Sequence, residues 1–174
     1  MQLHRRQILT YLACLPISGT FAAPLASVAM AASAREIGWE DLIPAGVPEA
    51  EIIDKGEFDE ERDIWRPVYD DNANRFNVDL GGKQVKIPGY IIPLEYSGDG
   101  VSTFILAPYA GACVHVPPPP PNQLVYVTTS TPYPNDKIFD AIWVTGTIKV
   151  NRVETELAEI GYEIDASEIK QYQW

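Results

Sequence analysis

Apolar and polar residues alternate along much of the chain after residue 75, which is the pattern of half-buried β-strands. The first alternating run is 76–80; Gly81-Gly82 follows it, and a second run starts at Val85. Two glycines between alternating runs predict a hairpin, because both turn residues of a tight hairpin take positive φ. Pro88-Gly89 then predicts a bend inside a strand that continues to residue 95, and such a bend helps a small barrel to close.

The later strands are predicted at 101–107, 124–129, 138–150 (with a bend or bulge at Gly146) and 162–172. Residues 130–137 contain two prolines and predict a loop, whereas 154–160 predict one or two helical turns. Five or six strands with glycine bends and no long helix predict an all-β protein. A small OB-like barrel of five to six strands fits best, and an open β-sandwich is the alternative.

Residues 35–74, ahead of the predicted barrel at 75–174, form an irregular acidic stretch with Pro44 and Pro48 as breakers. Trp39, Leu42 and Ile43 are spaced to place one face of a short helical turn on the core. We therefore expect an N-terminal arm that wraps the barrel and not a second domain.

Residues 1–34 have the features of a cleaved export signal. Arg5 and Arg6 give a positive start, a largely apolar segment follows, and the small residues Ala32-Ser33-Ala34 end it. The arginine pair also resembles a twin-arginine signal, with the ordinary secretory route as the alternative. We expect an exported, periplasmic protein. Because no second apolar stretch of about 18 residues follows, we expect no membrane span in the mature chain.

The predicted mature chain is strongly acidic. The whole chain has a formal charge of −11, and loss of Arg5 and Arg6 makes it about −13. Proteins bind phosphate backbones through lysine and arginine, so this balance argues against a nucleic-acid partner. A soluble exported protein explains the charge, and attraction to cations or to a basic partner is the functional alternative.

The segment 108–122 carries the most specific chemistry of the chain. It contains Cys113 and His115, whereas the other cysteine and histidine, Cys14 and His4, lie in the predicted signal. The mature chain would therefore keep one thiol and one imidazole, two residues apart. Directly after them come five consecutive prolines: Pro117, Pro118, Pro119, Pro120 and Pro121.

Cysteine thiolate and neutral imidazole are common ligands of zinc and also suit copper. In an extended segment, Cys113 and His115 would project to the same face and form half of a tetrahedral site. Carboxylates, water or a second subunit would complete it, and Asp136 and Asp140 are the nearest acidic candidates.

Two alternatives to a metal site stay open. In the first, the cysteine is a buried apolar residue and the histidine satisfies local backbone groups. In the second, the two form a catalytic pair in a cysteine-dependent hydrolase or transferase. Asn122 would then orient the histidine, and the backbone amides of Gly111 and Ala112 would form an oxyanion hole.

The five prolines predict a polyproline II rod, because each fixes φ and donates no backbone hydrogen bond. One interpretation is a docking surface for a protein partner with aromatic grooves, and Tyr109 and Asn122 are then counted with the prolines as partner-binding residues. The other is a stiff brace that packs on tyrosines such as Tyr109, Tyr126 and Tyr133. Asn122 would end the rod and satisfy a free backbone group.

Several strings of this sequence resemble a bacterial exported family known as domain-of-unknown-function family 3299. They are Trp39-Glu40-Asp41-Leu42-Ile43-Pro44, Ile87 to Glu95, Pro108 to Asn122 and the strand from Trp143 to Lys149. The resemblance implies an OB-like fold and an exported or periplasmic location. Some members of the family resemble proteins that accompany export-type ABC transporters or metal-stress genes. The resemblance therefore implies a role in metal handling. The family supplies no chemistry to carry over.

The sequence thus favours an exported accessory protein over an enzyme. We expect a transition metal, with zinc favoured, at Cys113 and His115, with a role in metal handling or beside an ABC-type transporter. A non-metal interaction module that contacts a transporter component through the polyproline segment is the main alternative.

Overall fold

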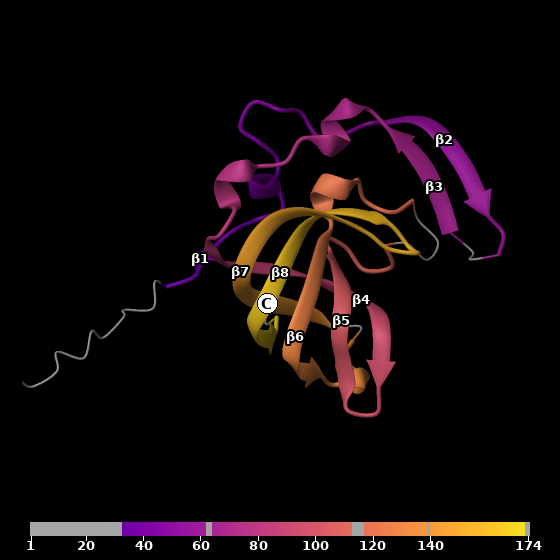
Figure 1. Cartoon of the computed structure of the whole chain (residues 1–174). Coiled ribbons are helices and arrows are strands. Elements are labelled where there is room, and N and C mark those ends of the chain that lie inside the picture. Colours follow the sequence, from indigo (N-terminus) through magenta and orange to yellow (C-terminus); the bar gives the residue numbers. More distant parts are fainter. Residues whose placement is uncertain (1–32, 62–63, 113–116, 139, 173–174) are drawn as a thin grey trace, which may run out of the picture. The chain divides into compact units, whose positions relative to one another are not determined.

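The structure, a computed structural model, describes residues 33–61, 64–112, 117–138 and 140–172. Five long strands form a barrel (Figure 1): β4 (Gln84–Ser97), β5 (Gly100–Ala107), β6 (Val125–Tyr133), β7 (Ala141–Glu154) and β8 (Glu159–Gln171). Their order is β4-β5-β6-β8-β7, and β7 pairs back with β4 to close the ring. Only the β6–β8 pairing in this ring is parallel. The predicted all-β, OB-like barrel is confirmed, and the closure excludes an open sandwich.

Strand β4 closes the barrel because it serves two neighbours. Its first half, from Gln84 to Tyr90, pairs with β7, and its second half, from Tyr90 onward, pairs with β5. The bend between the halves is at Pro88-Gly89, as predicted. A Cβ at Gly89 would lie 2.8 Å from the backbone oxygen of Ala107, so the close approach of β5 requires glycine here.

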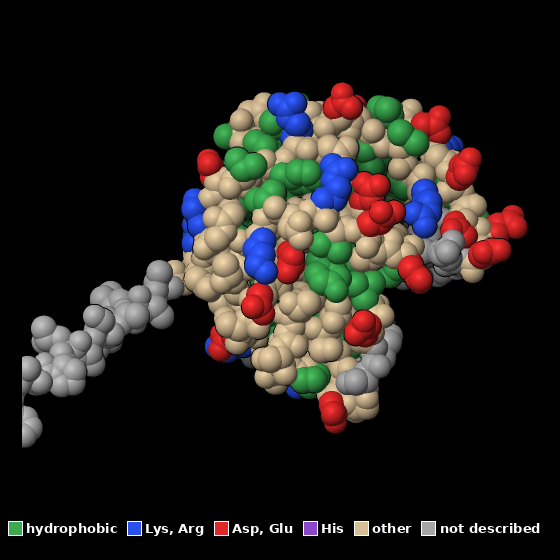
Figure 2. Space-filling view, viewed as in Figure 1, with side chains coloured by type: hydrophobic (Ala, Val, Ile, Leu, Met, Phe, Trp, Pro, Cys, Tyr) green, Lys and Arg blue, Asp and Glu red, His purple; other side chains and the backbone are tan. Residues whose placement is uncertain are grey.

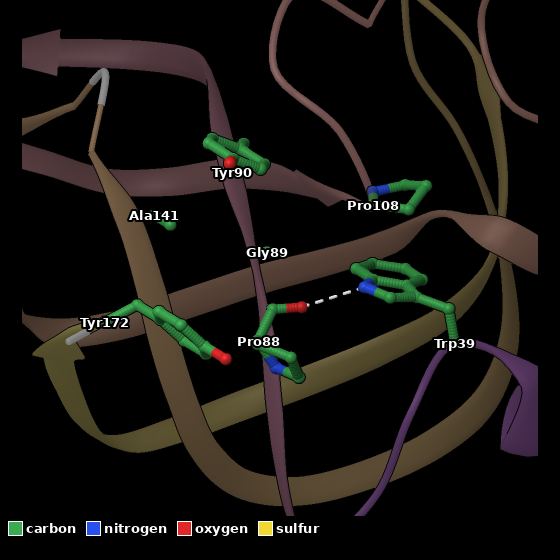
Figure 3. A pocket seen from close by; sticks show the side chains of 7 residues that line it. All are labelled: Trp39, Pro88, Gly89, Tyr90, Pro108, Ala141 and Tyr172. Atoms are coloured by element: carbon green, nitrogen blue, oxygen red, sulfur yellow. Dashed lines mark hydrogen bonds between the residues drawn. The ribbon is translucent and has the colours of Figure 1, made fainter. Parts of the chain in front are cut away.

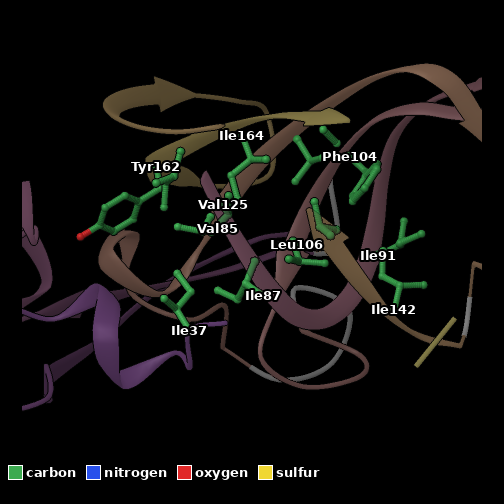
Figure 4. Close-up of a cluster of buried hydrophobic side chains, with 14 of the residues drawn as sticks. Ile37, Val85, Ile87, Ile91, Phe104, Leu106, Val125, Ile142, Tyr162 and Ile164 are labelled. Carbon is green, nitrogen blue, oxygen red and sulfur yellow. The ribbon is translucent and has the colours of Figure 1, made fainter. Parts of the chain in front are cut away.

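The core fills the barrel interior with side chains from alternate strand positions, which point toward one another in Figure 4. Tyr162, Ile164 and Ala166 of β8 are buried on one face, as the alternation predicts. A second apolar cluster uses the opposite face of the strands and includes Ile105, Leu124 and Ile160. The loop that follows β5 joins this outer cluster through Ala112.

The N-terminal arm contains β1 (Arg35–Glu36), η1 (Glu40–Leu42), β2 (Ile52–Asp59), β3 (Ile64–Tyr69) and η2 (Asp71–Asn74). The predicted helical turn is confirmed as η1, a 3-10 helix that buries Leu42. Strand β1 adds to β4, whereas β2 and β3 form a separate two-stranded antiparallel ribbon. The ribbon was not predicted, because the burial of β2 does not alternate and most of its side chains are exposed.

The hairpin predicted across Gly81-Gly82 is wrong. Residues 76–80 form no strand; they lead into the 3-10 helix η3 (Val78–Leu80). Asn77 starts this helix with a side-chain oxygen that accepts a hydrogen bond from the backbone N–H of Asp79. The backbone N–H of Gly82 donates to Ile148 of β7, so this segment crosses to the barrel and does not turn back on itself.

Two further local predictions need correction. Residues 130–137 are only partly a loop, because β6 continues to Tyr133, which pairs with Val101 beyond a bulge in the β5–β6 register. Residues 154–160 form no helical turn. Instead β7 and β8 are joined by a tight turn in which the hydroxyl of Thr155 accepts from the backbone N–H of Ala158. Within the described part of the chain, no helix is long and apolar enough to cross a membrane.

Candidate functional site

The loop between β5 and β6 is the candidate site, and both of its described halves are attached to the scaffold. In the first half, Ala112 is fully buried in the outer apolar cluster. In the second half, Pro118 and Pro119 are buried. Cys113 and His115 lie outside the described residues, so their pairing stays a prediction.

The described part of the polyproline run acts as a brace between the arm and the barrel. The hydroxyl of Tyr69, in β3, donates to the carbonyl oxygen of Pro118 at 2.7 Å, and that of Tyr109 donates to Pro117 at 3.2 Å. Proline can only accept such bonds, because it has no backbone N–H. Tyr109 was among the predicted contacts. Tyr69 was not, because 49 residues separate it from Pro118.

Asn122 ends the run at the start of η4 (Pro121–Gln123), and its side chain is fully buried. Its Nδ2 donates to the backbone oxygens of Asn72 at 2.9 Å, in the arm, and of Arg75 at 3.3 Å, directly after the arm. The prediction that Asn122 satisfies free backbone groups is confirmed. Its Oδ1 is buried with no hydrogen-bond partner among the described residues. Next to it, Gln123 Nε2 donates to Trp39 O at 2.9 Å.

A small aromatic pocket of about 180 Å³ lies where the loop leaves β5 (Figure 3). Its walls are mostly aromatic rings and prolines: Trp39, Pro88, Gly89, Tyr90, Pro108, Ala141 and Tyr172. The indole Nε1 of Trp39 donates to the backbone oxygen of Pro88 at 2.9 Å. The bend of β4 thus shapes this pocket and fixes the arm beside it.

A second hollow, which we call the polyproline groove, lies along the brace. It is bordered by β3, by the prolines and by the β7–β8 turn; its lining includes Trp65, Tyr69, Pro118, Pro119, Leu157 and Glu159. Arg66 of β3 donates from its guanidinium to the backbone oxygen of Glu156, 3.3 Å away in the β7–β8 turn. Sequence reasoning missed this groove, because its three walls come from distant segments.

The two predicted carboxylate ligands lie around Tyr133, at the end of β6. Asp136 belongs to η5 (Asn135–Lys137), and Asp140 accepts from Gln171 Nε2 at 2.8 Å. Burial raises the pKa of Tyr133, and the negative charges of Asp140 and Asp136 raise it further. Among the residues that the structure describes, no three Cys, His, Asp or Glu side chains gather closely enough to hold a metal ion.

The sequence and the fold of this chain are both similar to those of known proteins. A family model described as a protein of unknown function, domain-of-unknown-function family 3299, matches residues 39–171. The chain belongs to this family. A crystal structure of a family 3299 protein from Pseudomonas aeruginosa PAO1 at 2.45 Å resolution is similar to it, with 38% sequence identity and a TM-score of 0.67. The similarity covers 82% of this chain and 99% of that one. The comparison with curated proteins gives no match.

The family 3299 resemblance of the sequence is therefore confirmed. The matched region begins at Trp39 and includes the whole barrel together with most of the arm. The family description names no activity, so the function has to be argued from the residues of this chain.

Proposed function

We propose that this protein is an exported accessory protein that binds a transition metal ion, preferably zinc, through Cys113 and His115. The observation that carries the proposal is the anchoring of the loop on both sides of this pair. Ala112 is fully buried before it, and after it Pro118 is buried and bonded to Tyr69. Metal ligands are effective when neighbouring residues hold their backbone in place.

The donor types fit zinc. A thiolate and a neutral imidazole would supply two of the four ligands of a tetrahedral site, and both must be deprotonated to bind. When bound, zinc would act as a cargo or as a structural ion. Because the described carboxylates form no ready-made cluster, the remaining ligands would be Asp136 or Asp140, water, or groups from a second subunit.

The test is metal content. The protein, purified without chelator, should contain stoichiometric metal by elemental analysis. The double variant Cys113→Ser plus His115→Ala should lose that metal, whereas an exposed carboxylate variant, Asp79→Asn, should keep it. Unchanged metal in the double variant would refute the proposal. In the metal-free protein, a thiol that reacts with iodoacetamide faster than a model thiol would instead support the cysteine-dependent enzyme.

Export is part of the proposal and has its own test. The protein should be found in the periplasmic fraction with its first residues removed. Replacing Arg5 and Arg6 together by lysine should keep it in the cytoplasm if the twin-arginine route is used. Normal export of that variant would favour the ordinary secretory route.

The second candidate function is a protein-interaction module for a transporter component, as the family resemblance implies. The observation that favours it is the groove along the polyproline segment. Because Pro118 and Pro119 are buried, the prolines would contribute a wall of a docking groove and not a free-standing rod. Recovery of the same transporter component by the wild type and by a variant with a shortened proline run would contradict this role.

A further inference from the structure

The β2–β3 ribbon is an unusual part of this fold, because the barrel does not cover it (Figure 1). Isolated two-stranded ribbons are marginally stable in water. Four large apolar side chains of this ribbon are well exposed: Ile52, Ile53, Phe58 and Val68. Val68 is also one of the residues that line the polyproline groove, so the exposed apolar surface of the ribbon extends to that groove.

The free edge of β3 borders the polyproline groove. Within the described residues, β3 pairs with β2 alone, so its other edge has no strand partner. Five successive residues of β3, from Trp65 to Tyr69, line the groove. Pro67 in the middle of this run is typical of an edge strand, because proline cannot donate to a ladder.

The opposite wall cannot pair with an inserted backbone as a strand would. It is made of Pro118, Pro119 and Pro121, which have no N–H to donate. An extended segment in this groove would therefore find its backbone partners on β3. Addition of a strand to an exposed sheet edge is a common mode of peptide recognition.

The negative charge near the groove favours a partner segment with basic side chains. Carboxylates are numerous next to the groove: Glu159 lines it, Glu156 lies in the same β7–β8 turn, and β2, which pairs with β3, carries Asp54, Glu57 and Asp59. The nearby basic side chains include Lys55, Arg66 and Arg152. The guanidinium of Arg66 donates to the backbone oxygen of Glu156 and lies 3.9 Å from the carboxylate of Asp59, and Arg152 donates to Asn74 Oδ1 at 2.7 Å. Figure 2 shows acidic side chains gathered on the side of the molecule where the ribbon lies. A second copy of the chain would bring the same negative ribbon and meet like-charge repulsion.

We infer that the polyproline groove receives an extended segment of a partner protein in which basic and apolar residues alternate, and that this segment adds to the free edge of β3. Its basic side chains face the nearby carboxylates or the indole of Trp65, which attracts cations over its ring. Its apolar side chains meet Tyr69, the prolines and Leu157. This inference deepens the interaction role and does not depend on a metal at Cys113.

The probe is an acetylated ten-residue peptide that alternates lysine and valine, labelled for fluorescence anisotropy. The mature protein should bind it at least ten-fold more tightly than a peptide that alternates glutamate and valine. N-methylation of every second residue of the lysine peptide should weaken binding about ten-fold or more, because it removes the hydrogens that pair with a strand edge. Equal binding of the methylated and unmethylated peptides would overturn strand addition.

A pair of charge-matched variants locates the site. Glu156→Lys plus Glu159→Lys should weaken binding of the lysine peptide at least ten-fold. Asp79→Lys plus Glu168→Lys changes the net charge equally, on exposed residues outside the groove, and should change binding less than three-fold. Equal losses in both variants would overturn the assignment to the groove. The variant lacking Cys113 and His115 should bind the peptide like the wild type, so this result and the metal result can fail separately.

Discussion

Tyr162 offers the sharpest test of how the arm is held on the barrel. Its ring is fully buried in the core. Its hydroxyl donates to the backbone oxygen of Leu42 and accepts from the backbone N–H of Asn77 at 2.6 Å. Burial raises the pKa of Tyr162 to about 12, although the hydrogen bond from Asn77 acts in the opposite direction. One phenol thus links the arm, at Leu42, and the segment before η3, at Asn77, to the barrel, and it resists ionisation.

The raised pKa makes stability depend on pH in the alkaline range. Unfolded tyrosine ionises near pH 10, whereas folded Tyr162 keeps its proton until about pH 12. Between these values the folded state binds one more proton than the unfolded state, so stability falls as the pH rises. The contribution is complete below pH 10. A difference of about two pKa units corresponds to a loss of about 2.7 kcal/mol across this window.

The assay is urea unfolding of the wild type and of Tyr162→Phe at several pH values from 9 to 12. At pH 9 the variant should be less stable by about 1–3 kcal/mol, because two backbone groups lose a partner. As the pH rises, the difference between the two proteins should shrink. Other groups that titrate there, Tyr133 included, cancel in this difference. Parallel stability curves from pH 9 to 12 would refute the reasoning.

Three further predictions concern single contacts, each measured by chemical denaturation. Asn122→Ala should cost about 1–3 kcal/mol, because the carbonyl oxygens of Asn72 and Arg75 lose their donor; an unchanged stability would contradict this role of the amide. Gly161→Ala should cost about 1–3 kcal/mol, since the new Cβ would lie 2.0 Å from the ring of Phe76, and the double variant with Phe76→Leu should recover part of it. Trp39→Phe should cost about 1 kcal/mol through its lost bond to Pro88, and an unchanged midpoint would contradict that bond.

The barrel could be predicted because its strands follow a simple rule. In β8, Tyr162, Ile164 and Ala166 face the interior, and their alternation is visible in the sequence. The same rule gave a wrong strand prediction at 76–80, because the apolar residues there do not share one environment. Phe76 packs edge-on against Tyr162, Leu80 is buried, and Val78 is exposed. Alternation there reflects separate tertiary contacts and not a pleated strand.

The candidate site was only partly predictable, for a different reason. The role of Asn122 follows from local chemistry, because a short amide after a proline run can satisfy backbone groups. The contact from Tyr69 to Pro118 and the groove beside it depend on how the ribbon folds back over the loop. Strand β2 carries no buried face that would reveal that path, since its stability comes from pairing with β3.

The run of five prolines also determines how this loop can be observed in solution. Residues 117–121 are all proline and have no amide hydrogen. Amide hydrogen exchange and amide-detected NMR spectra therefore carry no signal from the polyproline run that braces the arm against the barrel. Labelled proline carbons, or the hydroxyl proton of Tyr69 that bonds to Pro118, would report on it directly. A peptide entering the groove would meet those nuclei, which makes them natural reporters for titration.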